Sequence, residues 1–203
     1  MGFTSAGSGR YVASGHPDPR KSGLPANLGL VESRDGGASW RGIAFYGAAD
    51  FHVLEAREDR VYAYDGRDGI LRTSADGRRW RERVPPGEVG SLAIDPRGSE
   101  RLVVATPGGL AASSDGGARW RPLRTDIAGA LSWPTGQRLY LVDGAGVVYL
   151  SRDAGRQWRQ TGDLRGEPTA FEAIGPDLYA ALPDGSVRRS TDDGASWSLI
   201  ASF

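Results

Sequence analysis

Apolar and polar residues alternate in short runs along the whole chain of 203 residues. One series of runs begins with Arg in four of its five copies and is rich in β-branched and aromatic side chains, which favour strands. The copies are RYVAS, RVYAY, RLVVA, RLYLV and DLYAA, beginning at residues 10, 60, 101, 138 and 177. No run of useful length carries apolar residues at helical spacing. The pattern therefore predicts an all-β protein made of short strands.

Tryptophan recurs at a nearly constant interval, with five of the six copies spaced 38 to 40 residues apart. Each of the five closes a related octapeptide: SRDGGASW, TSADGRRW, SSDGGARW, SRDAGRQW and STDDGASW. Four of these read Ser-x-Asp-x-Gly-x-x-Trp, whereas the second has Ala75 where Asp is expected and Asp76 one place later. The aligned positions are Ser33, Asp35, Gly37, Trp40, Thr73, Asp76, Gly77, Trp80, Ser113, Asp115, Gly117, Trp120, Ser151, Asp153, Gly155, Trp158, Ser190, Asp192, Gly194 and Trp197. A period of this length indicates a repeat architecture.

The octapeptide predicts a tight hairpin between the third and fourth strands of each repeat. Gly supplies the left-handed turn geometry, and the Asp and Ser side chains can hydrogen-bond the backbone of the turn. The Arg-led strand is preceded by a weaker strand and followed, after a Gly-rich turn, by a third strand. A four-stranded unit of this size cannot bury both of its faces alone, so the units are expected to stack as in a β-propeller. We expect the octapeptide residues to be structural rather than catalytic.

The Ser-x-Asp-x-Gly-x-x-Trp element resembles the Asp-box, or BNR, repeat. That repeat is found in bacterial sialidases, sortilin-type ectodomains, a photosystem II assembly factor and many bacterial propellers. The segment MGFTSAGSGRYVASGHPDPR is, more narrowly, similar to bacterial proteins that are labelled glycosyl hydrolases because of this repeat. The resemblance covers essentially the whole chain and implies a propeller fold. It also suggests that the full-length form is exported or associated with the cell envelope.

One propeller domain is predicted over residues 1–203. Its blades are expected at about 1–46, 47–86, 87–126, 127–165 and 166–203. Two arrangements stay open: five blades that close by packing alone, or an incomplete six-bladed ring with an exposed face. In the second case, formation of a dimer would hide that face.

Charge and composition narrow the classes of partner. Lys and Arg balance Asp and Glu at 25 each, so the chain has no overall positive field for nucleic acid. Cys is absent, which removes thiol nucleophiles, disulfides and Cys-based zinc sites. No apolar run is long enough to span a bilayer, and the first residues lack the pattern of a secretory signal. No cofactor and no metal site are predicted.

Candidate ligand-binding residues gather where two blades are expected to meet. In a propeller, the loops between second and third strands and those between blades share one face, the funnel face. The longest such loop, residues 14–27, contains His16 and Asp18, and Asp50 and His52 open the inner strand of the next blade. The following loop adds Asp65, Arg67 and Asp68. Such a group can bind a polar ligand such as a sugar or carboxylate, although the Pro-rich loop can equally be a rigid structural element.

Two functions follow from this pattern. The main prediction is a non-catalytic binding or scaffold module that holds a protein or glycan at its funnel face. The alternative is a glycoside hydrolase of the sialidase-like superfamily with carboxylates at the funnel. The chain lacks the F/Y-R-I-P motif found near the start of many sialidases, and no pair of carboxylates stands out. No catalytic residue is therefore assigned.

Overall fold

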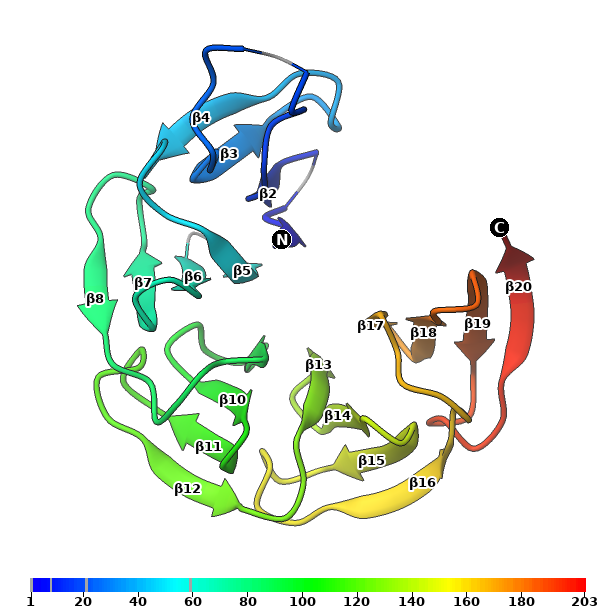
Figure 1. Ribbon diagram of the computed structural model, residues 1–203. Helices are drawn as coiled ribbons and strands as arrows, with labels where there is room; N and C mark the ends of the chain where they lie inside the picture. Colours follow the sequence, from blue (N-terminus) through cyan, green and yellow to red (C-terminus); the bar gives the residue numbers. More distant parts are fainter. Residues whose placement is uncertain (1, 8, 21, 59) are drawn as a thin grey trace. The chain divides into compact units, whose positions relative to one another are not determined.

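A computed structural model describes residues 2–7, 9–20, 22–58 and 60–203 of the chain. The described residues form strands, turns and loops without any helix, and the strands make five four-stranded antiparallel sheets (Figure 1). Within each sheet the strands are neighbours in chain order. The predicted all-β fold of four-stranded propeller blades is confirmed, with five blades in this chain. The described part of the chain has no helix with the length and apolar character needed to cross a membrane.

The chain divides into two compact units. Unit 1 comprises Met1–Val89 with Asp115–Arg119, and unit 2 comprises Gly90–Ser114 with Trp120–Phe203. The first sheet consists of β1 (Phe3–Ser5), β2 (Tyr11–Ala13), β3 (Leu30–Ser33) and β4 (Arg41–Ala44). The second consists of β5 (Phe51–Arg57), β6 (Arg60–Asp65), β7 (Ile70–Ser74) and β8 (Arg81–Arg83).

Unit 2 contains the strands of the remaining three sheets. The third sheet has β9 (Ser91–Ile94), β10 (Leu102–Thr106), β11 (Gly109–Ser113) and β12 (Arg121–Arg124). The fourth has β13 (Gly129–Thr135), β14 (Arg138–Asp143), β15 (Val147–Ser151) and β16 (Arg159–Asp163). The fifth has β17 (Ala170–Ile174), β18 (Asp177–Ala181), β19 (Ser186–Ser190) and β20 (Ser198–Ser202). Each predicted blade segment thus contains one sheet.

Apolar side chains fill the space between consecutive sheets of each unit. In unit 1, Val12 and Leu30 of the first sheet lie in one cluster with Phe51 and Ala63 of the second, and all four are fully buried. In unit 2, one cluster joins the third and fourth sheets and another joins the fourth and fifth. Burying apolar area between sheets is the main favourable contribution to folding of such blades.

The octapeptides form hairpin turns with a recurring set of hydrogen bonds. In the first, Ser33 Oγ donates to Asp35 Oδ1 and accepts from Gly37 N, both at 2.8 Å. Asp35 also accepts from Ser39 N and Oγ, and these bonds hold the pKa of the Asp35 carboxyl at about 2. Trp40 Nε1 donates to Gly37 O at 3.0 Å. Corresponding Ser and Trp hydrogen bonds recur in the fourth and fifth sheets.

The second turn differs from the alignment proposed from the sequence. Ser74, not Thr73, donates to Asp76 Oδ1 at 3.1 Å and accepts from Gly77 N at 2.9 Å. The other four turns each have two consecutive residues with positive φ, namely Gly36 and Gly37, Gly116 and Gly117, Ala154 and Gly155, and Asp193 and Gly194. The second has Gly77 alone, at φ 68°. The turn is one residue shorter, so Ser74 takes the position of the turn serine and Thr73 lies one residue before it in strand β7.

Candidate functional site

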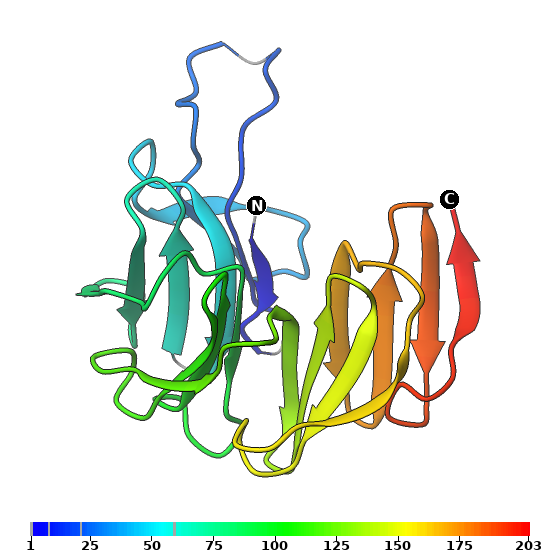
Figure 2. The ribbon, with the colours of Figure 1, turned by 60° about the horizontal axis from the view of Figure 1, so that its bottom comes forward.

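Asp50, His52, Asp65, Arg67 and Asp68 lie at one end of the second sheet. Phe51, at the start of β5, pairs with Asp65, at the end of β6, so Asp50 and His52 share this end with the loop 66–69. The loop between β2 and β3 of the first sheet carries His16. Figure 2 shows that loop, in blue, projecting well beyond the strands that it joins. Both segments belong to unit 1.

Two histidines face one carboxylate oxygen. His52 Nε2 lies 3.2 Å from Asp50 Oδ2, and His16 Nε2 lies 3.8 Å from the same oxygen. A carboxylate only accepts hydrogen bonds, so the short contact places a proton on His52 Nε2; in the neutral imidazole with this tautomer, Nδ1 is an acceptor. We call His16, Asp50 and His52 the histidine cluster.

The histidine cluster combines a covered carboxylate with open imidazoles. The Asp50 side chain is 14% exposed, whereas those of His16 and His52 are 53% and 52% exposed. Asp50 Oδ1 is buried and has no hydrogen-bond partner among the described residues. Folding alone does not favour such an oxygen, because an unpaired buried acceptor loses its hydration without compensation.

The projecting loop holds His16 in place through its backbone and a neighbouring amide. His16 Nδ1 lies 2.9 Å from Ala26 O, and Leu28 N donates to Gly15 O at 2.9 Å, which closes the base of the loop. In the amide orientation that satisfies its neighbours, Asn27 Oδ1 accepts from Arg67 Nη1 at 3.2 Å. Arg67 therefore connects this loop to the second sheet, and Asn27 is a residue that the sequence pattern did not single out.

A glycine lets His52 lie close to the loop 66–69. A Cβ atom added at Gly66 would lie only 2.5 Å from His52 Nδ1 and 2.7 Å from its Cε1. Gly66 N also donates to Asp50 O at 3.1 Å, which ties this backbone to the cluster. The motif YDGRDG contains this glycine, but nothing in the sequence indicates that a side chain from another strand packs on it.

Asp65 and Asp68 face an arginine rather than the histidines. Asp65 Oδ2 accepts from Arg72 Nη1 at 3.0 Å, while its Oδ1 accepts from the backbone N–H groups of Asp50 and Arg67. Its side chain is 3% exposed, so it supports the turn from within. Partial burial opposes a lower pKa for Asp68, but its hydrogen bonds from Arg72 and from Ile70 N outweigh that effect and lower the pKa.

Asp18 lies apart from the cluster. Among the described residues, its side chain accepts hydrogen bonds only from the Arg20 side chain and the Arg20 backbone N–H. These bonds lower the pKa of the Asp18 carboxyl. The structure therefore brings His16, Asp50, His52 and Arg67 together, places Asp65 and Asp68 behind them, and leaves Asp18 outside. In the described part of the chain, no group of three or more His, Asp or Glu side chains is arranged to hold a metal ion.

Comparisons with known proteins identify the fold alone. The chain is similar to a chain of the crystal structure of a nidogen/laminin complex, with 13% identity and a TM-score of 0.76 over 100% of this chain and 79% of that chain. It is also similar to YCF48 from Cyanidioschyzon merolae, with 14% identity and a TM-score of 0.55 over 98% of this chain and 84% of that one. A structure of YCF48 bound to D1 peptide matches with 14% identity and a TM-score of 0.62 over 98% of this chain and 68% of that chain.

No family model matches the chain. No curated protein matches it either. The fold and the solved structures together define a protein of β-propeller type with five blades.

Proposed function

We propose that the chain is a non-catalytic binding module and that the histidine cluster contacts a partner protein. The observation that carries this proposal is the pair of half-exposed imidazoles around the covered Asp50 carboxylate, with one buried carboxylate oxygen left unpaired. Polar groups that converge at a surface and are held by their own neighbours are typical of recognition sites.

The chemistry of the cluster suits a polar partner. In the neutral imidazole His52 Nδ1 can accept a hydrogen bond when Nε2–H points to Asp50, and the imidazole faces offer flat apolar area. A protein partner is supported by two of the solved structures, which are a nidogen/laminin complex and YCF48 bound to D1 peptide. These partners belong to those proteins, and we carry over only the class of ligand.

The finer assignments from the sequence are also proposals. The hairpin hydrogen bonds support membership of the Asp-box group within the sialidase-like propellers, and that membership suggests a bacterial protein that acts outside the cell or at its envelope. A glycan is the second class of ligand that we propose for the funnel face. If the ring is incomplete, a dimer is proposed to cover its exposed face through Phe3 and Trp40 of the first repeat, which are 63% and 44% exposed.

A glycoside hydrolase remains the alternative function. Such an enzyme requires two carboxyl groups that reach the substrate. Asp50 N contacts Asp65 Oδ1, so these two residues are neighbours, but Arg72 and the backbone hold Asp65 and its side chain is 3% exposed. The alternative predicts release of the aglycone from aryl glycosides, sialosides included, by the folded protein and loss of that release in His52→Ala.

Affinity capture tests the binding proposal. The wild-type chain, His52→Ala and Arg20→Ala are each immobilised on a separate column. The proteins that each column retains are identified by mass spectrometry. Arg20→Ala is the matched control because Arg20 lies on the same projecting loop as His16, is 88% exposed and bonds Asp18. We expect proteins that the wild type and Arg20→Ala retain and His52→Ala loses. Identical sets of retained proteins on all three columns would rule out a role for the cluster.

A further inference from the structure

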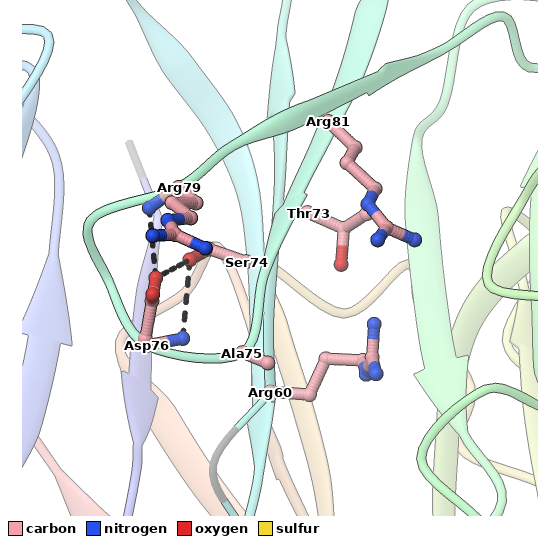
Figure 3. A pocket seen from close by; sticks show the side chains of 7 residues that line it. All are labelled: Arg60, Thr73, Ser74, Ala75, Asp76, Arg79 and Arg81. Carbon is pink, nitrogen blue, oxygen red and sulfur yellow. Dashed lines mark hydrogen bonds between the residues drawn. The ribbon is translucent and has the colours of Figure 1, made fainter.

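A second site lies at the opposite end of the second sheet. Antiparallel pairing of β6 and β7 sets Asp65 against Ile70 at the histidine-cluster end and Val61 against Ser74 at the other end. At this other end there is a hollow of about 190 Å³ beside the octapeptide turn. Figure 3 shows the seven residues that line it, which are Arg60, Thr73, Ser74, Ala75, Asp76, Arg79 and Arg81. We call this hollow the arginine pocket.

The first sheet has the same arrangement with a carboxylate in the middle. Glu32 of β3 pairs with Arg41 of β4, just as Thr73 of β7 pairs with Arg81 of β8. Tyr11 pairs with Ser33 and Val61 with Ser74, so the preceding residues, Arg10 and Arg60, also correspond. Two arginines of the arginine pocket therefore have counterparts around Glu32.

In the first sheet the carboxylate is bound by arginines on several sides. Arg10 Nε and Arg41 Nη2 each lie 2.7 Å from a Glu32 oxygen, and Arg34 Nε lies 2.8 Å away. The Glu32 side chain is only 2% exposed, and burial alone would raise its pKa. The three guanidinium groups outweigh burial and lower the pKa of Glu32 to about 2. This position thus binds a carboxylate in its ionised form.

The residue that corresponds to Glu32 differs among the other sheets. In the fifth sheet the charges are exchanged, because Arg189 stands at the position of Glu32 and pairs with Asp177 at 2.6 Å. The third and fourth sheets have the apolar Ala112 and Leu150 there, opposite Arg121 and Arg159. The second sheet has neither an acidic nor an apolar residue, but Thr73.

Thr73 is a buried polar group without an internal partner. The residue is 2% exposed, and its Oγ1 has no hydrogen bond within the described part of the chain. Figure 3 shows this hydroxyl between the guanidinium groups of Arg60 and Arg81. The acidic residue that lines the pocket, Asp76, accepts from Ser74 Oγ and from the backbone N–H groups of Arg78 and Arg79.

We propose that the arginine pocket binds a carboxylate supplied by another molecule, at the place that Glu32 fills from within the first sheet. Arg81 is suited to pair with both carboxylate oxygens, because a guanidinium presents parallel N–H donors, and the Thr73 hydroxyl can donate to the same group. The ligand we infer is an acidic side chain of a protein partner, since the internal occupant of the equivalent position is itself a glutamate side chain. The site is separate from the histidine cluster.

Binding of a fluorescein-labelled hexaglutamate peptide, followed by fluorescence anisotropy at low ionic strength, tests this proposal. Arg81→Gln should weaken binding at least about fivefold, because it removes the guanidinium opposite Thr73. Arg78→Gln is the matched control: it removes the same charge from the turn that precedes β8, but Arg78 does not line the pocket, and its effect should stay within about twofold. Equal losses in both variants would indicate unspecific charge attraction and overturn the proposal.

Thr73→Glu provides an independent test, because it supplies the carboxylate that the first sheet has at Glu32. This variant should lose at least about tenfold in peptide affinity without a lower melting temperature, since the new carboxylate meets the arginines. A lower melting temperature with unchanged binding would contradict the proposal, as would a wild-type chain that does not bind the peptide. A sulfated oligosaccharide that binds more tightly than the peptide and depends on Arg81 would overturn the assignment of a carboxylate.

Discussion

Glu32 and Thr73 stand at the same point of two successive repeats, each opposite an arginine at the start of its sheet's fourth strand. Glu32 is surrounded by Arg10, Arg34 and Arg41, whereas Thr73 has no hydrogen bond for its hydroxyl among the described residues. The same backbone register therefore supports an internal ion cluster around Glu32 in one blade and a hollow lined by arginines beside Thr73 in the next. The repeat fixes where the side chains stand, and single substitutions decide what they can bind.

Glu32 should make the unfolding free energy of the chain depend on pH in the acid range. Its pKa falls from 4.5 to about 2 in the folded chain, so its stabilisation is complete above about pH 4.5 and is lost as the pH falls through about 2. Glu32→Gln removes the ionised partner of three arginines and should lower the unfolding free energy at pH 7. Urea unfolding from pH 7 to pH 2 should show the difference between wild type and variant shrinking with falling pH. A difference that stays constant would show that the ion cluster does not act through the carboxylate charge.

The second octapeptide turn should depend on Ser74 and not on Thr73. Ser74→Ala leaves Gly77 N–H and one Asp76 oxygen without the bonds they make to Ser74, which should cost about 1–3 kcal/mol. Thr73→Val keeps the shape and removes a buried hydroxyl without a described partner, so stability should stay the same or rise. Chemical denaturation of the two variants measures both effects. If Thr73→Val were the more destabilising change, the turn would follow the alignment proposed from the sequence.

The repeated tryptophans should differ in their contribution to stability. Trp158 packs against the core between the third and fourth sheets and donates to Gly155 O at 3.0 Å. Trp158→Ala should therefore cost about 3 kcal/mol, at the low end of the range for large aromatic residues, because Trp158 is only partly buried. Trp40 is 44% exposed, and Trp40→Ala should cost clearly less. Thermal unfolding of both variants checks this order. Equal losses of stability would mean that burial does not determine how much each repeated tryptophan contributes.

Gly66 offers a way to displace His52 without removing it. The Cβ of Gly66→Ala would meet the His52 ring at 2.5 Å, and the half-exposed ring can turn away at a small cost. The unfolding free energy should change by no more than about 1 kcal/mol, as for a surface change with a movable neighbour. Affinity for a retained partner should nevertheless fall as in His52→Ala. Full affinity in Gly66→Ala would show that the position of the ring is not used in binding.

The tryptophan spacing and the octapeptides predict the strand order of all five sheets, because a four-stranded repeat with fixed turns leaves little freedom to the backbone. The contacts within the site are less predictable. That His16 and His52 share Asp50 depends on how a long loop folds back, and Arg72 captures Asp65 and Asp68 through a strand register that the motif YDGRDG does not reveal. Thr73 was misplaced because one deleted turn residue shifts the octapeptide relative to its strand.

The most direct test of the proposed function is the affinity of the wild type and His52→Ala for one purified protein retained by the wild-type column. Isothermal titration gives both constants, and matching melting temperatures show that the variant is folded. If the histidine cluster is the binding site, His52→Ala should bind the protein at least about tenfold more weakly. This is the size of effect expected when a central contact is removed. Affinities that agree within about twofold, the scale of effects at peripheral positions, would contradict it.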